Sequence, residues 1–189
     1  AMTPHPPPNQ MHAHPRPRRR IAVVTGLGAL GLFAAVGIGV SVAGQETSPP
    51  TPIVETGEIN AMGMPVIETP GGATGTAGAG PIEVTGASWQ LGTVPLDVAV
   101  RPTWTLRNSG SDPVVIGEPH PEVREGCCPG AFSIDSTTIE PGATADLGFE
   151  LSMHAGMDGW HDIAVHVPVR TGDTDHVLEL DVTGDFRNT

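Results

Sequence analysis

The chain has no lysine and no tyrosine, and no acidic residue precedes Glu46. All nine of its basic residues are arginines, and four of these lie before residue 21. The part beyond residue 45 therefore has five arginines against 21 acidic residues, a formal charge of −16. Nucleic-acid phosphates require a basic patch, so this distribution argues against nucleic-acid binding. Such acidity is typical of a solvated surface, and its long-range field also attracts cations.

Cysteine is almost absent, and the only two cysteines are adjacent, at Cys127 and Cys128. Adjacent cysteines cannot form the disulfide that joins the two sheets of an antibody domain. The chain has 189 residues but only three tryptophans and four phenylalanines, so its core depends mainly on aliphatic side chains. It also lacks a nucleophile–base pattern, a phosphate-binding loop and the hard metal ligands of a hydrolase, which argues against an enzyme.

The N-terminal part predicts a membrane anchor. Residues 1–20 are rich in proline and histidine and are expected to form a disordered cytosolic tail. Residues 21–44 are apolar and contain no charged residue. This segment is long enough to span a membrane as a helix. The arginines before this segment and the acids after it predict a single-pass protein of the bacterial cell membrane, with its C-terminal domain outside the cytoplasm. A signal peptide cleaved after Ala43 is the alternative, although the length of the apolar run favours an anchor.

Residues 45–80 contain many prolines and a glycine- and alanine-rich tract, which predict a flexible linker. The sequence leaves open whether Met62 and Met64, within this linker, contact the domain or bind metal.

From Pro81 to Thr189, short runs of alternating hydrophobic and polar residues are separated by turn residues. Such runs predict an all-β domain, an Ig-like antiparallel β-sandwich of about seven strands. The strand candidates are residues 82–85, 88–91, 98–106, 114–116, 132–134, 145–153, 163–169 and 175–186.

Three segments of this domain carry a family resemblance. Thr105–Gly110 with Pro113–Ile116, the cysteine segment, and Ile139–Thr144 resemble a bacterial exported Ig-like domain family of unknown function. The resemblance covers residues 82–186 and implies a sandwich of the major-sperm-protein type. That family usually has Cys-Gly-Cys where this chain has Cys-Cys-Pro. The Cys-Cys-Pro and Met-His-x-Gly-Met combination resembles a subgroup associated with copper, although the fold itself implies no activity.

A second cluster of soft ligands lies between residues 153 and 161, in the sequence MHAGMDGWH. Thiolate, thioether and imidazole together are the donors that Cu(I) prefers. Zn(II) is the competitor, because two cysteines and two histidines also make a tetrahedral site, but the methionines favour copper. The predicted metal ligands are Cys127, Cys128, Met153, His154, Met157 and His161.

Alternatives exist for these residues. The cysteines could instead form a strained disulfide with a redox or bridging role, or remain inert thiols. Met153 continues the core face of its strand, so a core role and a ligand role are equally supported. Met157 and His161 are the stronger ligand candidates. His120 is a weak candidate, and His166 is expected on the surface.

Strand order predicts that the two clusters meet. In an Ig-type sandwich the third strand is antiparallel to the sixth, so the end of the strand before Cys127 should lie beside the start of the strand after His161. The leading hypothesis is a membrane-anchored extracytoplasmic protein that holds Cu(I) for sequestration or for delivery to a membrane-bound cuproenzyme or respiratory complex. The alternative is a non-metal Ig-like interaction module of a membrane or envelope complex, with a structural or redox cysteine pair.

Overall fold

The computed structural model describes residues 53–127 and 130–188, which belong to one compact unit. Every regular element in these residues is a β-strand, which confirms the predicted all-β class. The predicted tail and apolar segment, residues 1–44, lie outside the described residues, as does Cys128. Within the described ranges, no helix is long and apolar enough to cross a membrane.

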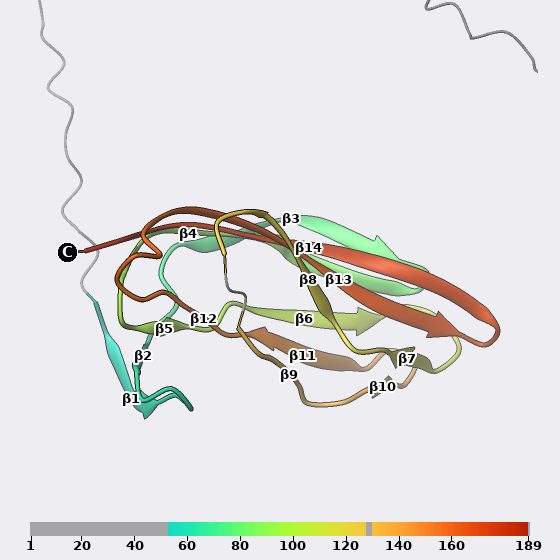
Figure 1. Ribbon diagram of the computed structural model, residues 1–189. Helices are drawn as coiled ribbons and strands as arrows, with labels where there is room; N and C mark the ends of the chain where they lie inside the picture. The colour runs from blue at the N-terminus through green and yellow to red at the C-terminus, as the bar shows by residue number, and fades with distance from the viewer. Residues whose placement is uncertain (1–52, 128–129, 189) are drawn as a thin grey trace, which may run out of the picture. The chain divides into compact units, whose positions relative to one another are not determined.

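One layer of the sandwich is built around the three longest strands (Figure 1). β13 and β14 form a long antiparallel hairpin, and β14 then pairs in parallel with β4. β3 adds to the other edge of β4, while β7 and β8 both pair with β13. The strands of this layer are β3 (Gly72–Ala79), β4 (Ile82–Pro95), β7 (Val114–Ile116), β8 (His120–Glu125), β13 (Gly159–Thr171) and β14 (Thr174–Arg187).

The second layer is connected to the first through hydrogen bonding between the start of β4 and the end of β6, where Ile82 lies opposite Asn108. β6 then pairs with β11, and β11 with β9. A small separate sheet of four strands packs at one end, in the order β1, β2, β5, β12. The remaining strands are β6 (Thr103–Asn108), β9 (Phe132–Ile134), β10 (Thr138–Ile139), β11 (Thr144–Phe149), β1 (Glu55–Ile59), β2 (Pro65–Ile67), β5 (Ala99–Val100) and β12 (Leu151–Ser152).

The core lies between the layers and follows the alternation of the strands. Trp104 of β6 lies beside Leu147 of the neighbouring strand β11, and both are buried, as are Leu106 and Phe149 on the same strands. The indole Nε1–H of Trp104 donates to the Ala87 carbonyl at 3.1 Å, so its one polar atom is satisfied inside the core. Each buried aliphatic or aromatic side chain contributes roughly 1.5–3 kcal/mol. The core faces predicted from alternation in residues 98–106 and 145–153 are the observed ones.

The predicted linker differs from the structure. β1, β2 and β3 all lie within residues 55–79, and Met64 and Ile67 are buried there. β3 consists only of glycine, alanine and threonine, yet it pairs with β4 from Gly72 to Ala79. Backbone hydrogen bonds supply this pairing, so the weak side-chain pattern concealed a strand. The folded unit therefore begins well before the predicted boundary at residue 81.

Two further details differ from the predicted antiparallel sandwich. The pairings of β14 with β4 and of β2 with β5 are parallel. The predicted strand over residues 145–153 is divided into β11 and β12, which belong to different sheets. The chain changes partner at Glu150, whose amide donates to the Ala131 carbonyl at 2.8 Å. Hydrophobic alternation continues through this change, because both sheets cover the same core.

Candidate functional site

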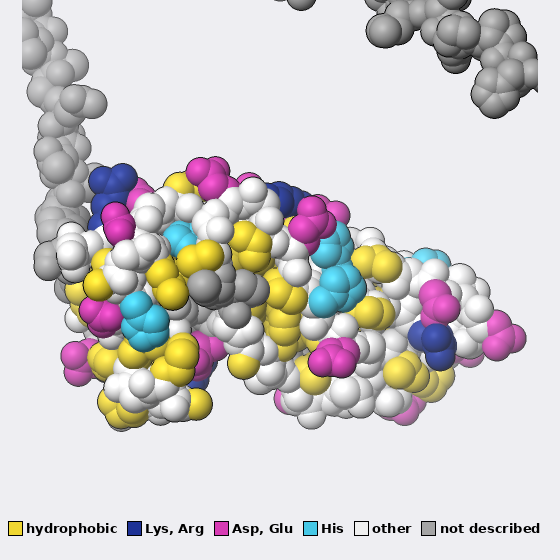
Figure 2. All heavy atoms as spheres, viewed as in Figure 1, with side chains coloured by type: hydrophobic (Ala, Val, Ile, Leu, Met, Phe, Trp, Pro, Cys, Tyr) yellow, Lys and Arg dark blue, Asp and Glu magenta, His cyan; other side chains and the backbone are white. Residues whose placement is uncertain are grey.

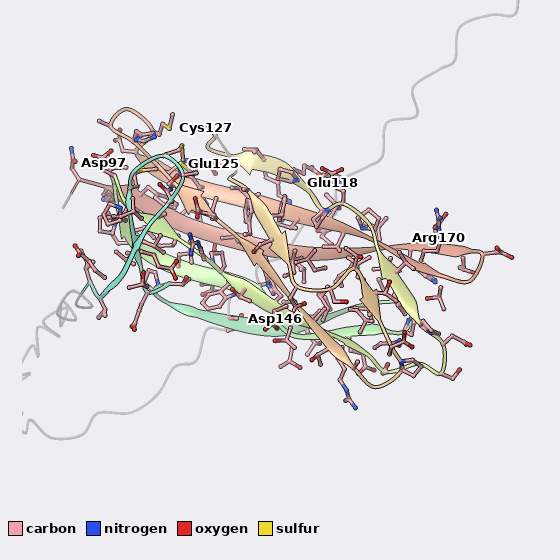
Figure 3. The ribbon with its side chains drawn as sticks, turned by 90° about the horizontal axis from the view of Figure 1, so that it is seen from below. Asp97, Glu118, Glu125, Cys127, Asp146 and Arg170 are labelled. Carbon is pink, nitrogen blue, oxygen red and sulfur yellow. The ribbon has the colours of Figure 1, made fainter. Side chains whose placement is uncertain are left out.

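The end of β8 lies beside the start of β13. The two strands are antiparallel, with Val123 opposite Ile163 and Glu125 opposite Asp162. Figure 3 shows Glu125, Cys127 and Asp97 at the same end of the domain, with Arg170 at the other. The strand order predicted from sequence therefore brings the cysteine segment to the β12–β13 connection.

Gly126 forms the contact between these two segments. It has a φ of +90°, a backbone conformation that favours glycine. A Cβ added at Gly126 would lie 2.3 Å from Cδ2 and 2.9 Å from Nε2 of His161. The absence of a side chain thus lets the backbone that leads to Cys127 rest directly against the imidazole ring.

His161 is the most informative residue of the site. Only 3% of the residue is exposed, and its ring packs edge-on against Phe186 at 5.0 Å between centroids. Nδ1 lies 3.1 Å from the Gly159 carbonyl oxygen. That oxygen can only accept, so Nδ1 carries a proton, and in the neutral ring the lone pair is on Nε2. Nε2 is buried and has no hydrogen-bond partner among the described residues.

A buried nitrogen with an unused lone pair costs free energy, roughly 1–3 kcal/mol. In metalloproteins the same tautomer, fixed by a hydrogen bond to the second ring nitrogen, orients imidazole as a ligand. Half-buried Cys127 follows the glycine that lies against this ring. The arrangement therefore brings the segment after β8, with its cysteine sulfur, and an oriented imidazole of β13 to one end of the sandwich.

The other four predicted ligands differ in their surroundings. Met153 is fully buried in the core, in accordance with its position on the apolar face of its strand. His154 points away to Asp97, whose Oδ1 lies 3.3 Å from its Nδ1. Met157 is partly buried against the core, in a turn closed by its own amide and the His154 carbonyl at 2.9 Å. Cys128 lies outside the described residues.

The described residues contain no group of three or more His, Cys, Asp or Glu side chains that could hold a metal ion. Thioether sulfurs and Cys128 lie outside this set of side chains. Sequence reasoning did not identify Gly126 or the Gly159 carbonyl as parts of the site. The only available signal was the glycine directly before the cysteines, which indicates a close approach of the backbone to a neighbour.

Acidic residues lie on the outer side of the same end. Trp160 is about half exposed and lines an open depression of about 640 Å³ together with Gly156 and Asp185. The pKa of Asp185 is held below its ordinary value, chiefly by the hydrogen bond from Arg187, with smaller contributions from the charges of Arg187 and His161. This end of the domain therefore keeps a carboxylate ionised near His161.

The chain matches no protein-family model and no curated protein sequence. Among solved structures it is similar to a PapD-like domain of human CEP192, with 12% identity over 62% of this chain and 88% of that domain, at a TM-score of 0.46. It is also similar to WR4, a C. elegans MSP family member, with 7% identity over 59% of this chain and 97% of that one, at a TM-score of 0.33.

A third similarity is to the secreted serine protease VesC from Vibrio cholerae, with 18% identity and a TM-score of 0.39. It covers 52% of this chain but only 21% of the protease chain. All three TM-scores lie below 0.5, so the assignment to a β-sandwich rests on the strands and pairings of this chain itself. The similarities say nothing about its activity.

Proposed function

We propose that this protein binds Cu(I) outside the cytoplasm, as cargo to be sequestered or delivered to a membrane-bound cuproenzyme. The observation that carries the proposal is the buried Nε2 of His161, which has a lone pair and no partner among the described residues and lies against Gly126. Cys127 and Cys128 would supply thiolate, and His161 would supply imidazole. Met157 would supply a thioether, and His154, whose Nδ1 pairs with Asp97, would keep Nε2 as a further nitrogen ligand, whereas Met153 is fully buried in the core.

The donor set fits this ion. Cu(I) takes few ligands and prefers sulfur, and thiolates bind it after losing their protons. Bound Cu(I) would remove the cost of the unpartnered nitrogen, so binding would also stabilise the fold. The N-terminal apolar segment, with arginines before it and acids after it, supports a membrane anchor and an extracytoplasmic domain.

An anaerobic Cu(I) titration of the full chain against a chromophoric competitor tests the proposal. The expected result is one tightly bound Cu(I), lost in the Cys127→Ser/Cys128→Ser variant. His176→Ala is the matched control, because it removes an imidazole on β14 and should bind Cu(I) like the parent. Affinity unaffected by loss of both cysteines would refute the proposal, and an intact disulfide without bound metal in untreated protein would favour a non-metal interaction module.

A further inference from the structure

Two histidines face each other on the outer side of neighbouring strands. His120 of β8 lies directly opposite His166 of β13 in the antiparallel register. Their rings stack with 5.4 Å between centroids and 24° between planes. Directly opposite residues of antiparallel strands project from the same face with Cβ atoms about 4.5–5.5 Å apart. Two imidazoles are thus held side by side by the sheet, at positions remote in sequence.

Glu122 orients one of the two rings. Its Oε2 lies 2.9 Å from Nε2 of His166. An ionised carboxylate can only accept a hydrogen bond, so Nε2 carries a proton, and in the neutral ring Nδ1 has the lone pair. A carboxylate that holds the second nitrogen of an imidazole is the arrangement that orients histidine ligands in metal sites.

The surroundings of the pair are rich in carboxylates. Glu179 of β14 lies opposite His166 on the side away from His120. Arg124 is the cation of this patch, and it bonds to Asp181 at 2.7 Å and pairs with Glu179 and Asp162. Four carboxylates, those of Glu122 and the three partners of Arg124, therefore share this patch with one guanidinium. Figure 2 shows histidine side chains gathered beside acidic ones on this face. The excess negative charge favours cations here.

We propose that His120 and His166 form a second metal site that binds a divalent transition-metal ion such as Cu(II), Ni(II) or Zn(II). Each histidine supplies one imidazole nitrogen, water completes the coordination, and Glu122 is the positioning residue. Imidazole suits these borderline ions, whereas Cu(I) selects the sulfur donors near the end of β8. The site lies on the exposed outer face and uses no residue of the proposed Cu(I) site, so each can exist without the other.

Paramagnetic broadening of amide NMR signals by substoichiometric Cu(II) tests this site in the full chain. The Cys127→Ser/Cys128→Ser background prevents reduction of Cu(II) by thiols. Because the N-terminal tail also contains histidines, the site is read from its own amides, those of His120, Ala164, His166 and Glu179. We expect these signals to broaden, to recover in the His120→Gln/His166→Gln variant, and to broaden as before in His176→Gln. Broadening confined to other regions, or unchanged in the double variant, would overturn the proposal.

The role of Glu122 has a separate readout. Glu122→Leu should lower the Cu(II) affinity of the His120–His166 site about tenfold, the usual effect of removing the partner of a histidine ligand. Glu122→Gln should retain more affinity, since its amide oxygen can still accept from Nε2–H of His166. Equal affinity in the parent and Glu122→Leu would contradict the positioning role. Loss of Cu(I) binding at the cysteine end would leave this result unchanged, so the two proposals fail separately.

Discussion

Gly126 and His161 lie so close that a Cβ on the glycine would come within 2.3 Å of the imidazole Cδ2. The contact joins the end of β8 to the start of β13, beside the ring whose buried Nε2 has no hydrogen-bond partner among the described residues. It thereby places Cys127 next to an oriented imidazole. The close approach is possible only because residue 126 has no side chain and adopts a positive φ.

Gly126→Ala should therefore destabilise the domain and displace His161. The positive φ costs about 1–2 kcal/mol for alanine, and the clash with the ring adds about 1–3 kcal/mol. Gly142→Ala is the matched control, because its φ is +77° and nothing lies within 4 Å of the added Cβ. Urea unfolding of both variants measures the difference. Equal loss of stability in the two would contradict the contact.

His161→Phe should separate stability from metal binding. The ring packing against Phe186 is kept, the hydrogen bond to Gly159 is lost, and the unpartnered nitrogen disappears. These effects oppose each other, and each is about 1 kcal/mol, so the unfolding free energy of the metal-free protein should change by less than about 1.5 kcal/mol. Cu(I) affinity should fall at least tenfold, about 1.4 kcal/mol. A strongly destabilised variant with unchanged Cu(I) affinity would show a purely structural histidine.

The two methionines of the loop should behave differently. Met153→Leu conserves volume in the core and should cost less than about 1.5 kcal/mol, with Cu(I) affinity unchanged. Met157→Leu should also preserve the fold, because the residue is only partly buried, but it removes a proposed thioether ligand and should weaken Cu(I) binding. Chemical denaturation and competitor titration on both variants provide the comparison. Equal Cu(I) affinities in the two variants would remove Met157 from the site.

Asp185 provides a pH prediction. Its pKa lies below the ordinary value of 3.8, first because of the hydrogen bond from Arg187. A lowered pKa means that the pair stabilises the folded state above the unfolded pKa, and that this stabilisation is lost as the pH falls through the folded value. Carboxyl ¹³C NMR should show the titration of Asp185 below pH 3.8. Arg187→Gln should raise its midpoint toward that of an ordinary aspartate, and an unmoved midpoint would contradict the assigned cause.

Alternation was sufficient to predict the core faces of the sandwich. Trp104, Leu106, Leu147 and Phe149 are buried as the period-2 pattern predicts, because each face of these strands has one environment. The pattern could not reveal β3, whose small residues have no hydrophobic signal, nor the change of sheet at Glu150, since both sheets bury the same face.

The candidate site was predictable in its location but not in its details. The antiparallel order of strands indicated that the cysteine segment and His161 would be neighbours, and the register of Glu125 with Asp162 agrees. The tautomer of His161 depends on the Gly159 carbonyl, and the stacking of His120 on His166 depends on register. Both are backbone relationships that residue types do not encode, so they required the folded structure.

X-ray absorption spectroscopy of the full chain loaded with one equivalent of Cu(I) under anaerobic conditions tests the central claim most directly. The account predicts sulfur and imidazole nitrogen in the first coordination shell of copper, with the imidazole signal lost in His161→Phe and the sulfur signal reduced in Cys127→Ser/Cys128→Ser. A shell of nitrogen and oxygen alone, or one identical in the parent and His161→Phe, would contradict a copper site at the junction of β8 and β13.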